Sequence, residues 1–129
     1  MIEFRLDPRS GVAAYLQIVH QVRQALLLGM LAEGDRLPTV KQVVAQVAIN
    51  PNTVLKAYRE LELEGLVAPK PGAGTFVTRT LVQTSISEHE PLRREFEGWL
   101  AKARAAGLSE AELDALIRTT VRDTADEET

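Results

Sequence analysis

The sequence predicts a mainly α-helical protein with one small β-hairpin, an α+β fold in which a C-terminal helical hairpin follows the main domain. Apolar residues recur at helical spacing, capping signals separate the helical stretches, and two short β-prone runs flank a glycine-containing tip at residues 70–74. The 129 residues can bury roughly two-thirds of the unfolded surface. We expect one domain over residues 1–79, then a linker and a short helical domain over residues 80–129.

The first helix is predicted over residues 13–28, because its apolar residues fall on one face and Gly29 follows as a helix-ending residue. Residues 1–13 before it are expected to form an extended arm with a turn at residues 7–11. Residues 31–36 after it are expected to form another turn. The predicted stripe consists of Tyr15, Ile18, Val19, Val22 and Leu26.

Residues 37–65 are predicted to form two helices joined by a tight turn. Thr39 and Gln42 have the spacing of a capping box, so the first of these helices should begin at Val40. Asn50 is a favourable N-cap for the second helix, and Pro51 suits its first position, where no N–H partner is needed. The apolar stripe of this region is Val54, Ala57, Tyr58, Leu61 and Leu66.

This layout is typical of a helix-turn-helix, whose second helix enters the major groove of DNA with its N-terminal residues towards the bases. The first turn of that helix presents Asn52 and Thr53, and the cations Lys56 and Arg59 follow one turn later. A corner between two helices in any small helical domain gives the same pattern. Both interpretations stay open on these residues alone.

The stretch after Gly65 favours the DNA-binding interpretation. Two β-prone runs around Lys-Pro-Gly-Ala-Gly predict a hairpin, and a hairpin directly after a recognition helix is a wing. Lys70 and the backbone at Gly72 could approach a phosphate or a minor groove. A nucleotide-binding loop is disfavoured, because these glycines lie inside a hairpin and do not open a helix.

Several motifs in this order resemble the winged helix-turn-helix domain of the GntR family of bacterial transcription regulators, over about residues 14–77. They are Asp35-Arg36-Leu37-Pro38, Asn50-Pro51-Asn52-Thr53-Val54, Ala57-Tyr58-Arg59-Glu60-Leu61-Glu62, Glu64-Gly65-Leu66-Val67 and Gly72-x-Gly74-Thr75-Phe76-Val77. The Asn-Pro-Asn-Thr-Val segment and the short C-terminal tail are most similar to the YtrA-like subfamily, in which control of transporter operons is common.

The resemblance implies which residues contact DNA. Two positions depart from the family pattern, since Lys41 stands where arginine is more common and Lys70-Pro71 lies in a wing that is more often rich in arginine. Arginine can bind guanine or phosphate through two hydrogen bonds, which lysine cannot do in the same way. The implied DNA-binding residues are Lys41, Asn50, Asn52, Thr53 and Gly72, with Pro51, Lys56 and Lys70 close by.

The charge is unevenly distributed along the chain, although the total is −3. Residues 1–79 contain nine lysines or arginines and seven acidic residues, a net charge of +2, whereas residues 80–129 contain six and eleven, a net charge of −5. The cations therefore lie where DNA would bind. The positive field is weak, so non-specific affinity for DNA should be modest at physiological salt.

Two helices are predicted beyond the linker. The first covers residues 91–106 with Gly107 as its cap, and Ser109 with Glu112 forms a capping box that opens the second. A hairpin of this size cannot bury both apolar stripes on itself, so it must cover them with the winged domain or with a second copy of the chain. Residues 123–129 are expected to be frayed.

The resemblance favours a second copy of the chain over the winged domain as the cover for these apolar stripes, because YtrA-like proteins have a short helical dimerisation tail. Ala103 lies on the apolar face of the first of these two helices, and Val121 lies on the expected inner face of the second. The predicted dimerisation residues are Leu92, Phe96, Trp99, Leu100, Leu113, Leu116 and Ile117.

Enzymatic, metal-binding and membrane functions are not expected. No catalytic constellation stands out, cysteine is absent, and His20 and His89 have no partners at metal-ligand spacing, so we expect no cofactor and no metal. The N-terminus lacks an apolar signal core, and no run of about 18 apolar residues occurs. These features predict a cytoplasmic protein.

Together the sequence predicts a transcription regulator, a repressor that binds a palindromic double-stranded DNA operator as a homodimer. One alternative is a winged-helix module that binds other proteins, which the weak positive charge favours slightly. Another is a sensor in which a small-molecule effector at the dimer interface controls binding. The sequence identifies no effector site, since about 50 residues in two helices leave little volume for a pocket.

Overall fold

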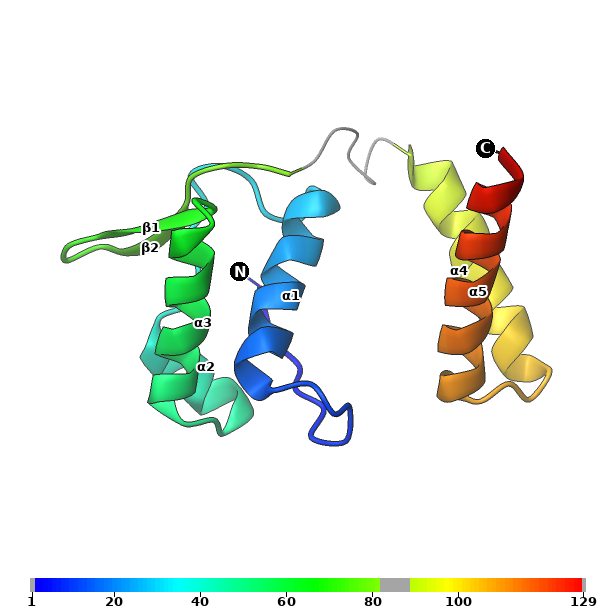
Figure 1. The fold of residues 1–129 in the computed structure, drawn as a ribbon, viewed down its shortest axis with the longest axis horizontal. Helices are drawn as coiled ribbons and strands as arrows, with labels where there is room; N and C mark the ends of the chain where they lie inside the picture. The colour runs from blue at the N-terminus through cyan, green and yellow to red at the C-terminus, as the bar shows by residue number, and fades with distance from the viewer. Residues whose placement is uncertain (1, 82–88, 129) are drawn as a thin grey trace. The chain divides into compact units, whose positions relative to one another are not determined.

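The computed structural model describes residues 2–81 and 89–128. The chain divides into two compact units, Met1–Glu88 and His89–Thr129. The elements of the first unit, labelled in Figure 1, are α1 (Ala14–Leu27), α2 (Val40–Val47), α3 (Pro51–Leu63), β1 (Val67–Lys70) and β2 (Gly74–Val77); those of the second are α4 (Glu90–Ala105) and α5 (Glu110–Glu128). The predicted fold class, mainly helical with one β-hairpin, is confirmed.

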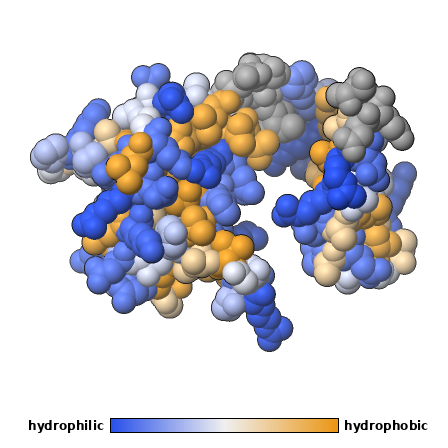
Figure 2. Space-filling view, viewed as in Figure 1, coloured by the Kyte–Doolittle hydropathy of each residue, from blue (hydrophilic) through white to orange (hydrophobic). Residues whose placement is uncertain are grey.

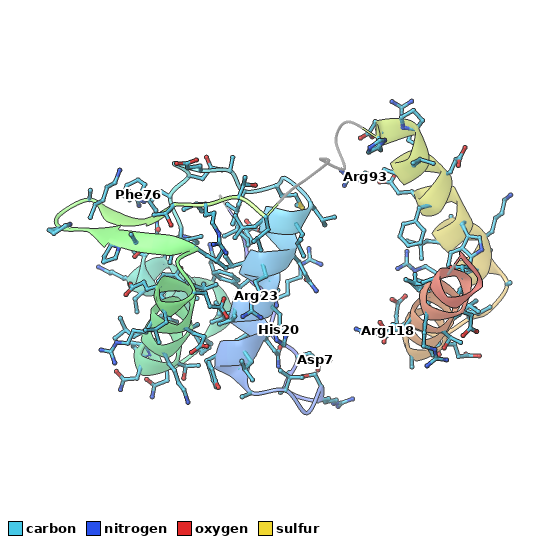
Figure 3. The ribbon with its side chains drawn as sticks, turned by 45° about the horizontal axis from the view of Figure 1, so that its top comes forward. Asp7, His20, Arg23, Phe76, Arg93 and Arg118 are labelled. Carbon is cyan, nitrogen blue, oxygen red and sulfur yellow. The ribbon has the colours of Figure 1, made fainter. Side chains whose placement is uncertain are left out.

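Three helices enclose the core of the first unit, and α3 contacts both α1 and α2. The predicted stripe of α1 is buried except for Tyr15, which is half-buried, and the whole predicted stripe of α3 is buried. Arg23 of α1 also forms an ion pair with Glu64 at the end of α3. Figure 3 shows Arg23 projecting from α1 towards α3. Helical periodicity alone therefore located this interface correctly.

The predicted capping signals form. The Thr39 hydroxyl accepts a hydrogen bond from the N–H of Gln42 at 3.1 Å, and the Gln42 side chain accepts one from the N–H of Thr39 at 2.9 Å. The Asn50 side chain accepts a hydrogen bond from the N–H of Asn52 at 2.8 Å. Between the two helices, Ala48 has φ 49° and ψ 50°, a left-handed conformation that is costly for alanine. This residue produces the tight turn.

The wing is more than a two-stranded hairpin. Strands β1 and β2 pair in antiparallel register, with Val67 opposite Val77 and Lys70 opposite Gly74. The other edge of β2 pairs with residues 34–37, where Leu37 donates to the Thr75 carbonyl at 2.9 Å and Val77 donates to the Asp35 carbonyl at 2.8 Å. The prediction of a simple turn at residues 31–36 was therefore incomplete, because these residues also continue the sheet.

The N-terminal arm is held along α1 by side-chain amides. Gln21 bonds both the N–H and the carbonyl of Arg5, at 3.0 and 2.6 Å, and Gln17 bonds the same two groups of Asp7 at 2.8 and 2.9 Å. Phe4 is only 3% exposed and belongs to the core. The arm is extended before a turn at residues 8–12, close to the predicted turn at residues 7–11, but it is also a packed part of the domain.

The second unit is a hairpin of α4 and α5. The Ser109 hydroxyl accepts from the N–H of Glu112 at 3.1 Å and the Glu112 carboxylate accepts from the N–H of Ser109 at 3.0 Å, so the predicted capping box is confirmed. Hydrogen bonding from Ser109, chiefly from its backbone N–H, lowers the pKa of the Glu112 carboxyl. Helix α5 continues to Glu128, so residues 123–128 are helical, and the expected fraying of residues 123–129 stays a prediction. No glycine or proline follows Gly107 to end the helix.

Candidate nucleic-acid interface

The N-terminal turn of α3 carries the polar residues that the sequence singled out. Asn50, Pro51 and Asn52 are exposed and Thr53 is half-buried. The side-chain oxygen of Asn50 is occupied by the cap bond to Asn52, which leaves its NH₂ group as donor, whereas the Asn52 side chain has no hydrogen bond within the described residues. Asn52 therefore has both a donor and an acceptor available to a ligand.

A groove of about 320 Å³ lies between α3, the start of α2 and the wing. Its lining includes Leu55, Arg59 and Glu62 from α3 and Thr39 and Val40 from the start of α2; Pro38, Tyr58, Pro69, Gly74 and Thr75 complete it. Leu55 and Arg59 are not among the site residues predicted from the sequence. Their positions three and seven residues after Asn52 place them on the same helix face, and this spacing was the signal that could have found them.

Four cations on α2, α3 and the wing, of which Arg59 lines the groove, are not neutralised by the protein. Within residues 2–81 and 89–128, none of Lys41, Lys56, Arg59 and Lys70 forms an ion pair. Lys56 Nζ lies 4.1 Å from the centre of the Tyr15 ring on α1, and Lys70 Nζ lies 4.6 Å from that of Phe76 on the wing. A cation–π contact orients an ammonium group but leaves its charge available to an anion.

The second unit differs, since its five arginines all pair with nearby carboxylates, and among its lysines and arginines Lys102 alone forms no ion pair within residues 89–128. Figure 3 labels two of them, on α4 and α5. Such exposed pairs contribute little to stability, but they cancel the local field. The positive charge available to a polyanion is therefore concentrated in the winged unit. The pairs are Arg93–Glu97, Arg94–Glu90, Arg104–Glu110, Arg118–Asp114 and Arg122–Asp123.

The wing extends away from the helices on the side of α3 remote from α1, as Figures 1 and 3 show. At its tip Gly72 has φ 76°, and a Cβ atom added there would meet no described atom within 4 Å. The tip can therefore bring its backbone against another molecule without a side chain in between. Gly74, with φ 121°, instead lies against the Arg36 side chain, which would be 3.4 Å from such a Cβ atom.

The predicted dimerisation residues divide into two groups. Leu113 is buried inside the α4–α5 hairpin, whereas Leu92, Phe96, Trp99 and Leu116 are exposed and Leu100 and Ile117 are half-buried. Phe96 and Trp99 stack with their ring centres 6.2 Å apart. Figure 2 shows hydrophobic surface on this unit. An open apolar groove of about 420 Å³ is lined by Phe96, Trp99, Leu116, Ile117, Thr120 and Val121.

The residues that the structure describes also bear on membrane and metal sites. No helix among them has both the length and the apolar character needed to cross a membrane. No group of three or more histidine, aspartate or glutamate side chains in the same ranges is arranged to hold a metal ion.

Comparisons with known proteins agree with this geometry. The profile of the family described as "Bacterial regulatory proteins, gntR family" matches residues 14–77, from the start of α1 to the end of β2. The HTH-type transcriptional repressor YtrA of Bacillus subtilis is 32% identical over 115 residues, which cover 88% of each chain. The uncharacterised HTH-type transcriptional regulator YhcF of Bacillus subtilis is 32% identical over 111 residues, which cover 86% of this chain and 92% of YhcF.

A solved structure extends the similarity to the fold. YtrA from Sulfolobus acidocaldarius, a GntR-family transcription factor, superposes with a TM-score of 0.54 at 26% sequence identity, covering 93% of this chain and 97% of that chain. The predicted resemblance to YtrA-like proteins is thus confirmed over most of the chain. The chain belongs to the GntR family of bacterial regulatory proteins, as a DNA-binding transcription regulator with a winged helix-turn-helix.

Proposed function

We propose that the chain is a cytoplasmic repressor that binds a palindromic operator as a homodimer. The observation that carries this proposal is the group of unneutralised cations around the polar N-terminus of α3 and the wing. The name of the Bacillus subtilis relative, a transcriptional repressor, supports repression over activation. The proposed DNA contacts are Lys41, Asn50, Pro51, Asn52, Thr53, Lys56, Lys70 and Gly72, to which the groove adds Arg59.

The proposed contacts have different roles. Asn52, with both hydrogen-bonding groups of its side chain available, reads a base edge, and asparagine is suited to adenine. Asn50 caps the helix through its side-chain oxygen and fixes the position of that reading residue. The lysines and Arg59 bind phosphates, which supply affinity and register but little sequence information. The Gly72 tip follows or enters the minor groove.

The apolar groove on α4 and α5 is the proposed dimer surface. Covering Phe96, Trp99, Leu116 and Ile117 with the same residues of a second chain would form a symmetric interface. Dimerisation would present two recognition helices to half-sites about one helical turn apart. Leu113 and Ala103, both buried in the hairpin, would support this surface from beneath.

Selection of bound duplexes from a random library by the full-length chain, repeated over a salt series, tests the proposal. We expect a two-fold symmetric motif whose affinity falls as salt rises, because phosphate neutralisation releases counterions. Recovery of an asymmetric single half-site would contradict the dimer. Sequence-independent binding, or none, would contradict operator recognition.

A comparison of two variants tests the assigned roles. Asn52→Ala should relax the preference at one position of each half-site, with a discrimination loss of about 1–3 kcal/mol. Lys56→Ala should weaken binding to all sequences alike and lower the salt slope by about one. Titrations of both variants against the selected duplex and a scrambled duplex separate the two effects, and equal behaviour of the variants would refute the assignment.

A further inference from the structure

Leu55 is an apolar side chain on the part of α3 that the proposed function turns towards DNA. It is 41% exposed and lines the groove together with Thr39, Val40 and Arg59. It follows Asn52 by three residues and precedes Arg59 by four, so the three side chains share one helix face. Leu55 therefore lies between a proposed base-reading residue and a proposed phosphate-binding residue.

An exposed leucine alone carries little information, since apolar atoms form much of any protein surface. The location of Leu55 makes it informative. Leu63, on the same helix, is 84% exposed and is not part of the groove lining, whereas Leu55 lies in the concave region framed by the start of α2 and the wing. A duplex that occupies this groove would remove the exposed part of Leu55 from water.

The chemistry of the major groove identifies the group that an aliphatic side chain can recognise there. Thymine presents a methyl group at C5, and the other edges of the four bases present mainly hydrogen-bonding groups. A leucine opposite a donor or acceptor would leave it unpaired, whereas contact with a methyl group buries apolar surface on both sides.

The spacing along the helix relates this contact to the one made by Asn52. Three residues correspond to about 4.5 Å along a helix axis, and successive base pairs are about 3.4 Å apart. Residues with this separation can reach neighbouring base pairs. We propose that Leu55 is a specificity-determining residue that contacts the C5 methyl group of a thymine, next to the base pair read by Asn52.

This inference rests on the proposed function, and a cycle that combines removal of single methyl groups from the DNA with substitution of Leu55 tests it. The probe is the duplex selected by the wild-type chain, resynthesised with deoxyuridine in place of one thymidine at a time, which removes only the methyl group. For the wild-type chain, one thymine in a half-site should be sensitive, with affinity about fourfold weaker, as expected for one buried methyl group. No sensitive thymine would overturn the inference.

Variants of Leu55 assign the effect to its side chain. Leu55→Asn, similar in size but polar, should bind the thymidine and deoxyuridine duplexes equally, and Leu55→Met should retain the difference. Leu63→Asn is the matched control and should behave as the wild type. A penalty that persists in Leu55→Asn would overturn the inference while leaving the proposed function intact. If the wild-type chain selects no motif, the proposed function fails and this inference fails with it.

Discussion

The Tyr58 hydroxyl donates a hydrogen bond of 2.5 Å to the carbonyl oxygen of Pro38, across twenty residues of sequence. Both residues are buried, and each also lines the groove between α3, the start of α2 and the wing. The bond joins the middle of α3 to the residue before the Thr39 cap of α2. It therefore fixes the distance between the two helices that form the helix-turn-helix.

Tyr58→Phe should lower the free energy of unfolding by about 1–3 kcal/mol, because it leaves the buried Pro38 carbonyl without a donor. Urea denaturation followed by circular dichroism measures the change. Tyr15→Phe is the control, since the Tyr15 hydroxyl has no hydrogen bond within the described residues, and it should change stability by less than about 0.5 kcal/mol. Equal losses in the two variants would contradict the assigned role of the bond.

The same hydroxyl should make stability depend on alkaline pH. Burial raises the pKa of Tyr58 above its ordinary value. Above about pH 10 the unfolded chain loses this proton while the folded chain keeps it, so the free energy of unfolding falls as pH rises, by up to about 1.4 kcal/mol per pH unit. The stability difference between wild type and Tyr58→Phe should therefore shrink from about pH 9 to about pH 11. A constant difference in urea denaturation would contradict this.

Ala48→Gly should stabilise the protein. Ala48 has φ 49°, and relief of its left-handed strain should outweigh the greater freedom of glycine in the unfolded chain by about 0.5–1 kcal/mol. Thermal unfolding gives the measurement. Ala45→Gly, at an exposed position inside α2, is the matched control and should destabilise by about 1 kcal/mol. Destabilisation by both changes would show that the turn does not require this conformation.

Phe96→Glu should dissociate the proposed dimer, because it places a carboxylate in the apolar groove of each chain. An unpaired charge buried at an interface should raise the dissociation constant by about a hundredfold or more. Ala101→Glu introduces the same side chain at an exposed position on the opposite face of α4 and should leave the dimer intact. Sedimentation equilibrium of both variants distinguishes these outcomes, and identical behaviour would exclude this groove as the interface.

Phe4→Ala should lower the free energy of unfolding by about 3–5 kcal/mol, because the ring lies in the core at 3% exposure. Glu3→Ala, at the exposed neighbouring position, should change it by less than about 0.5 kcal/mol. Urea denaturation of the two variants is the test. A small effect of Phe4→Ala would mean that the arm contributes little to the domain.

Features encoded by residues near one another in sequence could be predicted. The caps at Thr39, Asn50 and Ser109 and the buried stripes of α1 and α3 depend on spacings of three or four residues, and all of them form. The pairing of residues 34–37 with β2 could not be predicted, because backbone hydrogen bonds between distant segments leave no local pattern. The contacts of Gln17 and Gln21 with the arm were missed for the same reason.

In the candidate site too, features set by neighbouring residues could be predicted, whereas contacts between distant segments could not. The polar start of α3 and the glycine tip could be predicted from capping and turn chemistry. Arg59 and Leu55 share a helix face with Asn52, as their spacing indicates, but the sequence does not show that this face lies beside the start of α2 and the wing, so they were not selected. The predicted apolar residues of α4 and α5 included Leu113, since periodicity does not distinguish the interior of a two-helix hairpin from its outer surface.

The central position of β2 in its small sheet affects how the wing can respond to a ligand. Because β2 is bonded to β1 on one edge and to residues 34–37 on the other, its base cannot pivot without breaking bonds on a neighbouring strand. The turn at residues 71–73 makes no backbone hydrogen bond to residues 34–37. The wing thus has a base that is hydrogen-bonded on both edges of β2, which limits the conformational entropy lost on binding, and a tip that is held only by the pairing of β1 with β2.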